Sequence, residues 1–558
     1  MTKYFLVFIL TLVCHLTLLG QTQVIKGRVI DLNNKRPVPY ASVGIVNSSI
    51  GTATNDLGEF ELKYACPEQC TLKISSIGYK TYTLVLTEAS IGTIALTPSP
   101  KVLKEVVVRS KQIDARKVVK KAFRSIKKNY LSAPLTFKSF YRHYSKEDTA
   151  YIRLIEAAFD MHYKRGYSRP KNIDASGIKL RLTQLRRSLD VTGGAPYRSN
   201  YIKRTIANDI IAYQGKRDYS AYRDLLWDNN SLLKRNNKDF VFELSKITEL
   251  DGQEVYEILF SYTPDSLFEQ SGYVHAGKLY ITMPDYAIVR YESSTHPSQL
   301  EHNYHYDRKS IVQYKKYDNK YVLFHIAHDR TTMAKEKNYR RHTEHIEVLI
   351  NEIVRGKNEK IHRSDITRED MIGMDYDPSF WEKYTVLKAN PLESKIIEHL
   401  QKDMPFSEQF LLKQAMDRKI LAIEKEAYSQ FNHYINEEDN QLVFVSFWTA
   451  SRDFGMKAFT ANQNVVDAYR NKGVKFVHLS IDSDRTAWEN SWSSYKLDKD
   501  MHLWIGRYSP VLKGLGLLGL PRYLLYKRGK LVMKRAPAPG STDFGPLLDR
   551  HLKSLPNQ

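Results

Sequence analysis

The stretch with the most chemical promise is the turn at residues 449–455, between the apolar run QLVFVSFW and the helical pattern GMKAFTANQNVV. A nucleophile at such a helix N-terminus has its pKa lowered by the helix dipole and by exposed N–H groups. The last four positions of the turn read Arg-Asp-Phe-Gly, and none of them carries a thiol. We therefore expect no thiol chemistry here, and we expect Arg452 and Asp453 to offer charge for binding instead.

Hydroxyl groups beside this turn are the alternative candidates for a nucleophile. Thr449 and Ser451 flank it, and His478 and Asp482 bracket the next strand-like run. A hydroxyl nucleophile needs a positioned base and an oxyanion site, and no elbow motif or fixed spacing supports either. These residues are interpreted as ordinary parts of the fold, so no catalytic residue is predicted.

Histidines occur in two groupings, HNYH (302–305) and HTEH (342–345), with His325 and His328 between them. Zinc needs three or four converging ligands with fixed tautomers. The spacings match no metal site closely, so they predict surface histidines on strands and loops. No metal and no other cofactor is expected.

Only three cysteines occur in 558 residues. Cys14 lies in residues 1–20, a short apolar run with one lysine that predicts a signal peptide, with an uncleaved anchor as the alternative. In an exported chain, Cys66 and Cys70 favour a structural disulfide over a zinc or redox role. We expect a location in the periplasm or at the outer membrane.

The net charge of +22 is concentrated in one region. Residues 101–200 hold 24 Lys and Arg against 8 Asp and Glu, including the runs 116–128 and 181–187. Nucleic acid is excluded as a partner by the expected export, which leaves an acidic partner, lipid phosphates or lipopolysaccharide. A solvated helical face is the competing interpretation.

Residues 23–97 alternate apolar and polar side chains with frequent turn signals, which predicts about seven short strands in a small sandwich. GRVIDLNNKRPVPYASV, TNDLGEFEL and ISSIGYKTYTL within this range resemble the carboxypeptidase-like regulatory domain, a prealbumin-like sandwich. The resemblance implies a fold and an envelope location in Gram-negative bacteria but no peptidase activity.

A Pro-punctuated connector and a basic helix are expected over residues 98–130, followed by a β-rich, α+β middle domain over 131–374. Alternating segments such as GQEVYEILFSYTP and GKLYITMPDYAIVRYESS predict one long antiparallel sheet, curved or half-closed. Their rhythm resembles the lipoprotein-carrier half-barrel, which implies a groove for lipid or peptide. Residues 375–439 predict a helical connector.

Residues 440–558 resemble the thioredoxin superfamily, and most closely its TlpA-like thiol-disulfide oxidoreductases. NQLVFVSFW, VKFVHLSID, GLPRYLLYKRGKLV and PAPGSTDFGPLLDRHLKSL match in order. The chain departs from the family at 452–455, where the family has Cys-x-x-Cys. Pro521 matches a family proline that is cis, which implies that Leu520 and Pro521 dock an extended peptide beside the turn; preservation of the fold is the alternative.

The sequence therefore predicts a multidomain protein with an all-β sandwich, a β-rich middle domain and an α/β thioredoxin-like domain with a degenerate active site. The favoured function is non-catalytic binding of a protein, peptide or lipid partner in the envelope, with an acidic membrane surface as a further partner. The rivals are a periplasmic thiol-disulfide oxidoreductase-related enzyme and a lipid or lipoprotein carrier.

Overall fold

The structure is a computed structural model, and it forms two compact units, residues 1–413 and 414–558. It describes residues 23–555 apart from 65–68, 87–89, 100–112, 168–177, 190–200, 207–208, 213–239, 263–272, 298–303, 335–340, 359, 364–365, 385–387, 389–393, 395–396, 399, 451–453, 483–484, 496–498, 507–511, 513–519 and 521. The predicted signal peptide and Cys66 lie outside the described residues. No helix among those described is long and apolar enough to span a membrane.

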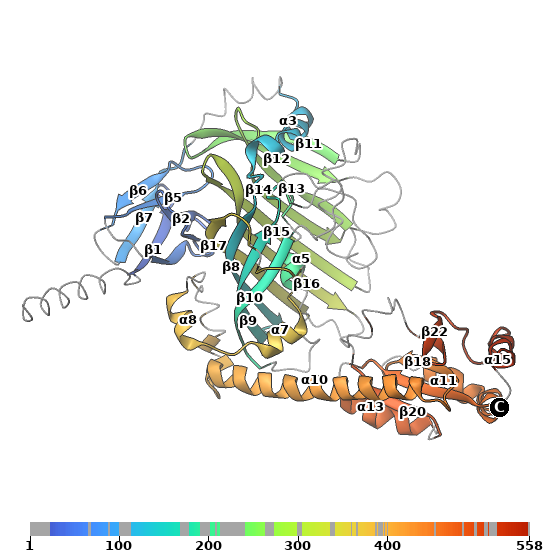
Figure 1. Cartoon of the computed structure of the whole chain (residues 1–558). Helices are drawn as coiled ribbons and strands as arrows, with labels where there is room; N and C mark the ends of the chain where they lie inside the picture. Colours follow the sequence, from blue (N-terminus) through green and yellow to red (C-terminus); the bar gives the residue numbers. More distant parts are fainter. Residues whose placement is uncertain are drawn as a thin grey trace, which may run out of the picture. The chain divides into compact units, whose positions relative to one another are not determined.

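The first unit begins with the predicted sandwich, built from two sheets ordered β4-β1-β7 and β3-β2-β5-β6 (Figure 1). Its strands are β1 (Gln23–Asp31), β2 (Ser42–Ile45), β3 (Gly51–Ala53), β4 (Glu59–Tyr64), β5 (Thr71–Ser75), β6 (Tyr82–Val85) and β7 (Ser90–Leu96). Buried residues alternate with half-buried ones along β4 and β5. That alternation packs Ile25, Phe60 and Leu72 into one core between the sheets. The seven-strand prediction is confirmed.

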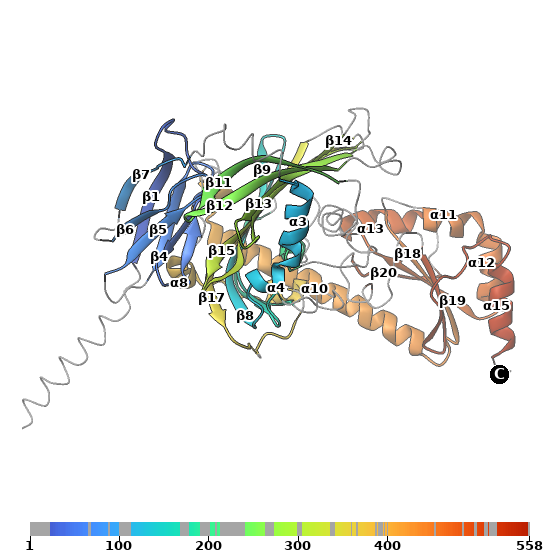
Figure 2. The same cartoon turned by 90° about the horizontal axis from the view of Figure 1, so that it is seen from above.

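A ten-stranded antiparallel sheet makes up most of the first unit, in the order β10-β9-β8-β17-β16-β15-β14-β13-β12-β11. Its strands are β8 (Leu135–Glu147), β9 (Ala150–Tyr163), β10 (Ile178–Arg187), β11 (Phe240–Leu250), β12 (Gln253–Tyr262), β13 (Tyr273–Thr282), β14 (Ile288–Pro297), β15 (Tyr304–Tyr317), β16 (Lys320–Ala334) and β17 (Arg341–Arg355). The chain meanders from β11 to β17 and then pairs β17 with the earlier strand β8. The sheet curves strongly, and α3 and α4 lie inside its curve (Figure 2).

Both faces of this sheet are covered by the chain itself. One face packs against α3 (Ala115–Arg124), α4 (Ile126–Asn129) and α5 (Tyr201–Ile206) in the largest hydrophobic core. The other face packs Phe140, Phe324 and Leu349 against Ala53 of the sandwich and Trp381 of α8 (Pro378–Lys383). Among the described residues, the face inside the curve is therefore packed against the protein's own helices.

A buried carboxylate fixes the segment that follows α5. Asp209 accepts hydrogen bonds from the hydroxyls of Tyr163 and Tyr314, both at 2.8 Å, and from the backbone N–H groups of Ile211 and Ala212 at 3.1 Å. Burial raises the pKa of Asp209, although these hydrogen bonds oppose the shift. The hydroxyl of Tyr167 is a fifth donor, at 3.3 Å. Together the five hydrogen bonds satisfy the buried carboxylate, and none of these five donors is a cation.

The basic run 181–187 is not a solvated helical face, because it belongs to strand β10. Arg186 donates to Glu156 at 2.6 Å and lies over the ring of Trp381, while Arg142 holds the other oxygen of Glu156 at 2.8 Å. Burial raises the pKa of Glu156, but the two arginines outweigh it and leave the pKa lowered. The cations of this run are thus engaged within the sheet.

Helical segments follow the sheet and begin at Arg368, earlier than the helical connector predicted for residues 375–439. They include α7 (Arg368–Gly373), α8 and the long helix α10 (Phe406–Asn436). Thr367 and Asp370 form a capping box at the start of α7, and Asp377 caps α8. The division between the two units falls within α10.

The second unit contains a five-stranded sheet ordered β20-β19-β18-β21-β22. Its strands are β18 (Leu442–Trp448), β19 (Val474–Ser480), β20 (Met501–Trp504), β21 (Arg522–Lys527) and β22 (Lys530–Met533), and its further helices are α11 (Phe454–Ala461), α12 (Gln463–Asn471), α13 (Arg485–Trp492) and α15 (Phe544–Lys553). β18 pairs parallel with β19 and antiparallel with β21. This is the strand–helix–strand order, with a closing hairpin and helix, that the thioredoxin resemblance implies.

Candidate functional site

The turn that follows β18 is held by one carboxylate. Asp482 accepts the backbone N–H of Ala450 with both oxygens, at 2.9 Å each, and the hydroxyl of Ser480 at 2.8 Å. Asp482 is buried, so these charge-assisted bonds operate away from bulk water. Asp482, which the sequence offered as a partner for a hydroxyl nucleophile, therefore fixes the backbone where the turn begins.

Most residues of the predicted peptide-docking surface lie outside the description. Arg452, Asp453 and Pro521 are not among the described residues, and Leu520 is half-buried against the apolar cluster of β18 and β19. Their role stays a prediction. Residues 414–558 contain no cysteine, so the second unit has no thiol of its own for thiol exchange.

Below the turn, a buried hydrogen-bond chain links two strands to a helix. Ser446 Oγ lies 2.7 Å from Nδ1 of His478, and His478 Nε2 lies 3.0 Å from Asp500 Oδ2. Arg470 of α12 binds both oxygens of Asp500, at 2.8 and 2.9 Å. Since a carboxylate only accepts, a neutral His478 donates from Nε2 and accepts the hydroxyl proton of Ser446 at Nδ1.

The order of groups in this chain is that of an activated hydroxyl, but its location excludes that use. Ser446 and His478 are each 0% exposed, so a substrate cannot reach the hydroxyl. The ring of Phe459 also packs edge-on against His478, with 4.6 Å between centroids. These hydrogen bonds therefore join β18, β19 and α12 and have a structural role.

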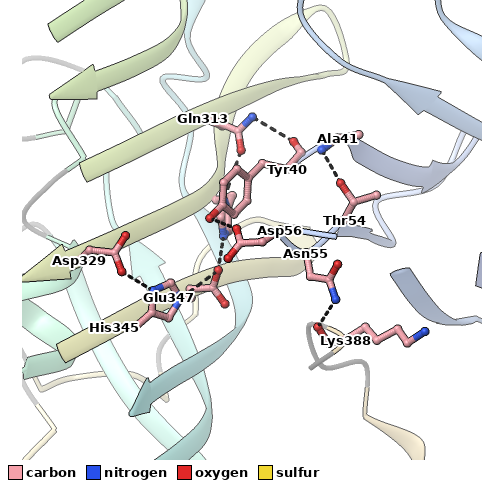
Figure 3. A network of polar contacts seen from close by, with 11 residues as sticks. Tyr40, Ala41, Thr54, Asn55, Asp56, Gln313, Asp329, His345, Glu347 and Lys388 are labelled. Atoms are coloured by element: carbon pink, nitrogen blue, oxygen red, sulfur yellow. Dashed lines mark hydrogen bonds and ion pairs between the residues drawn. The ribbon is translucent and has the colours of Figure 1, made fainter. Parts of the chain in front are cut away.

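A second polar network joins the sandwich to the large sheet (Figure 3). Tyr40 lies between β1 and β2, and its ring stacks on His325 of β16 with 5.3 Å between centroids. Gln313 of β15 donates to the carbonyl of Tyr40 at 3.2 Å and accepts from His325 Nδ1, also at 3.2 Å. The hydroxyl of Tyr40 donates to Asp56 at 2.5 Å. One sandwich residue is thus held by both domains.

The local sequence of the sandwich presents these groups rigidly. Thr54 accepts the N–H of Ala41 at 2.8 Å and donates to the carbonyl of Val38 at 2.7 Å, which closes the loop that carries Tyr40. In the TNDLG turn, Asn55 Oδ1 accepts from the backbone two and four residues on. Gly58 has φ +73°, and a Cβ there would lie 2.2 Å from the carbonyl oxygen of Val29, so only glycine fits.

Near Tyr40, one carboxylate lies between two histidines. Glu347 Oε1 is 3.4 Å from Nε2 of His345 and 3.7 Å from Nε2 of His325. His345 also contacts Asp329 through Nδ1 at 2.7 Å, and its ring stacks on Tyr144. We call His325, Asp329, His345 and Glu347 the histidine–carboxylate cluster. All four come from β16 and β17.

Each charged group of the cluster favours the ionised form of its neighbour. Burial alone lowers the pKa of His345, but the charge of Glu347 and the hydrogen bond to Asp329 raise it well above its usual range. Burial likewise raises the pKa of Glu347, and the two histidines outweigh it and hold that pKa far below its ordinary value. Burial and the negative charges of Glu347 and Asp56 raise the pKa of Tyr40. An imidazolium at His345 paired with an ionised Glu347 is the stable arrangement.

Further contacts fix the rim of the sandwich. Asn55 donates to the carbonyl of Lys388 at 3.3 Å, and Lys388 pairs with Glu59 at 3.3 Å. At the other end, Ser99 donates to Glu249 at 2.6 Å and Thr81 to Asp251 at 2.8 Å, both near the end of β11. Lys315 donates to the carbonyl of Ser49 at 3.5 Å, and burial lowers its pKa to about 8.

The prediction of surface histidines is wrong for His325, His328 and His345, which are all buried, and the sequence patterns correspond only partly to this cluster. His345 of HTEH and His325 join it, while His328 instead contacts Ser310, and His302 lies outside the described residues. Within the described chain, no three His, Cys, Asp or Glu side chains are arranged to hold a metal ion. Sequence reasoning missed Tyr40, Gln313 and Glu347, because their proximity depends on strand register and on packing between domains.

The cysteines lie in the first unit. Cys70 is disulfide-bonded, whereas Cys66, its predicted partner, is not among the described residues. The pairing of the two stays a prediction.

Comparison with known proteins gives a match to a domain family only near the start of the chain. Residues 25–108 match the sequence family called CarboxypepD_reg-like domain. No curated protein matches the chain.

Solved structures similar to this chain include the thioredoxin domain of a Bacteroides vulgatus thiol-disulfide oxidoreductase, with 19% identity over 20% of this chain and 81% of that one, and a TM-score of 0.19. A Bacteroides fragilis thiol-disulfide oxidoreductase is 22% identical over 21% of this chain and 87% of its own, with a TM-score of 0.18. A secreted Mycobacterium tuberculosis disulfide oxidoreductase is 19% identical over 21% and 83%, with a TM-score of 0.17.

Proposed function

We propose that this chain is an exported, non-catalytic binding protein of the bacterial envelope, which holds a protein or peptide partner on its thioredoxin-like unit. The observation that carries the proposal is a fixed backbone at Ala450, where the turn begins, in a unit that contains no cysteine. Asp482 fixes the backbone of the turn through Ala450, while residues 414–558 contain no cysteine. A helix N-terminus without a thiolate is suited to docking a partner and cannot support dithiol exchange.

The first unit supports a scaffolding role. Tyr40, Gln313 and the rim contacts fasten the sandwich to the large sheet, so the two domains present their surfaces as one body. The described residues of α3, α4 and α5 pack against the face inside the sheet's curve, which supports partner binding over a lipid-carrier function there. No observation favours the carrier function over partner binding.

The first test separates binding from thiol chemistry. We expect the mature protein to show no more reduction of insulin by dithiothreitol than a buffer control. A Cys66→Ser/Cys70→Ser variant should behave identically, because those sulfurs are expected to be structural. Insulin reduction above the control in that double variant would refute the non-catalytic proposal.

The second test asks for the partner directly. A photoactivatable cross-linker placed at Arg452 should capture a defined partner in intact cells, whereas the same group at Lys530, exposed on the edge strand β22, should not. An Asp453→Ala change should weaken the capture from position 452 if the turn's charges take part. Equal capture from both positions, or an acyl chain found in the purified protein by native mass spectrometry, would contradict the proposal.

A further inference from the structure

Helices α3 and α4 carry a stripe of positive charge on one side. The two helices are nearly continuous, since Ser125 between them has φ −86° and ψ −1°. Six of their residues are exposed, and every one is a cation: Lys117, Lys120, Lys121, Arg124, Lys127 and Lys128. At 100° per residue these six fall within an arc of about 120° and span about 16 Å of helix. We call them the cationic stripe.

The opposite side of the same helices is committed to the core. Ala115, Val118, Val119 and Ala122 are buried against the large sheet, and Ile126 continues this row into α4. The side chain of Asp114 caps α3 by accepting the N–H of Lys117 at 3.0 Å. The apolar row is therefore unavailable for insertion elsewhere, and the cationic stripe is held facing outward.

Among the described residues, one cation of the stripe forms an ion pair and one lies over an aromatic ring. Lys117 lies 3.5 Å from Asp114, and Lys121 lies over the ring of Tyr286 at 4.0 Å. The other four cations make no ion pair within the part of the chain that the structure describes. Lys320 adds a further cation nearby, since its ammonium donates to the carbonyl of Lys128.

The positive side chains of the cationic stripe repel one another. Three like-charged pairs stand three residues apart and three stand four apart, and each such pair destabilises a helix by a few tenths of a kcal/mol. A helix face that is merely solvated usually intersperses both signs, which would turn these pairs into attractions. An external anionic surface would attract all six cations, and this attraction would offset the repulsion between them.

We propose that the cationic stripe docks the protein on a bilayer that contains anionic lipids. A bilayer fits better than an acidic protein, because protein interfaces depend on buried aromatic or apolar anchors and the exposed positions of these helices offer none. A lipid headgroup layer instead presents spread-out negative charge along the whole stripe. This inference rests on residues separate from the thioredoxin-like turn, so it stands or falls independently of the proposed function.

The experiment is co-sedimentation of the full chain with vesicles. We expect binding to phosphatidylcholine vesicles that contain phosphatidylglycerol and none to pure phosphatidylcholine. Raising the salt from 0.1 M to 1 M shortens the screening length from about 10 Å to about 3 Å, so it should release the protein. Each cation near an anionic surface contributes about fivefold to affinity, so Lys120→Gln/Arg124→Gln/Lys127→Gln should weaken binding roughly a hundredfold.

The matched control is Lys402→Gln/Lys419→Gln/Lys425→Gln, which removes the same net charge from exposed positions elsewhere. It should bind nearly as the unmodified chain does. The stripe variant should unfold at the same or a higher temperature, because the substitutions relieve repulsion on an exposed face. Absence of binding to anionic vesicles, equal losses in both triple variants, or tighter binding to polyglutamate than to vesicles would each overturn the proposal.

Discussion

Replacing Glu347 by Gln removes the charge that holds two histidines together beneath the sandwich. Glu347 is 3% exposed, and its Oε1 lies 3.4 Å from His345 and 3.7 Å from His325. Removing one partner from a buried ion pair costs about 3–5 kcal/mol. The side chain of Asp329, half exposed, still contacts His345 in the variant, so we expect the lower end, about 3 kcal/mol.

The pH dependence gives a second readout of the same interaction. The pKa of Glu347 is lowered, so its contribution is present above its ordinary pKa of 4.5 and is lost as the pH falls toward the lowered value. The pKa of His345 is raised, so its contribution is fully present below the ordinary value of 6.5 and is lost as the pH rises through the raised one. The effect of Glu347→Gln should therefore be largest between about pH 4.5 and 6.5 and should shrink at alkaline pH.

Equilibrium urea unfolding at several pH values measures this effect, with hydrogen exchange of the β16 and β17 amides as the local report. Glu352→Gln is the matched control, because Glu352 lies on the same strand and pairs with Lys138 at the surface, at 2.8 Å. That exposed pair should contribute at most about 1 kcal/mol. Equal losses for the two variants, or a Glu347→Gln effect that does not change with pH, would refute the reasoning.

Three further changes test the second unit. Asp500→Asn should destabilise it by about 3 kcal/mol in urea unfolding, because Arg470 loses a carboxylate that it binds through both oxygens. Asp549→Asn, at an exposed pair with Lys472, should cost clearly less, and equal costs for the two variants would contradict the assignment. Asp482→Asn should speed hydrogen exchange of the Ala450 amide by about tenfold or more, and an unchanged rate would show that the carboxylate does not fix the turn. Arg452→Cys/Gly455→Cys should gain insulin-reducing activity with dithiothreitol, since a thiol at a helix N-terminus ionises readily; an inert double variant with a formed disulfide would show that the turn has lost the family's geometry.

Local patterns predicted those parts of the fold that depend on local chemistry. Alternation along residues 59–64 and 71–75 corresponds to β4 and β5. In the turn before β4, the side chain of Asn55 accepts backbone hydrogen bonds, and Gly58 adopts a positive φ because it has no Cβ. The charges of the run 181–187 permit two interpretations, a surface that binds an anionic partner and a solvated helical face. Its arginines instead lie on β10, where Glu156 on the neighbouring strand accepts from Arg186. Such cross-strand pairing is invisible without the register.

Register also explains why the histidine–carboxylate cluster was not predicted. His325 pairs with Leu349 and Asp329 with His345, which places Glu347 between the two histidines on one face of β16 and β17. A shift of one residue would turn Glu347 to the opposite face and separate the cluster. The contribution of Tyr40 depends further on the docking of the sandwich, more than 270 residues away in the sequence from Gln313.

The buried polar groups of both units share a property that bears on function. Ser446, His478 and the cluster residues His325 and Glu347 are all nearly or fully inaccessible, so their hydrogen bonds cannot act on an external substrate. Their loss should therefore appear in stability and in pH dependence rather than in turnover. By contrast, the six cations of the stripe are exposed, and four of them make no ion pair in the described chain. Carboxylates interspersed among these cations would stabilise the helices through attractive pairs. The uniform positive charge of the stripe therefore favours a role in binding an anionic surface over a role in stability.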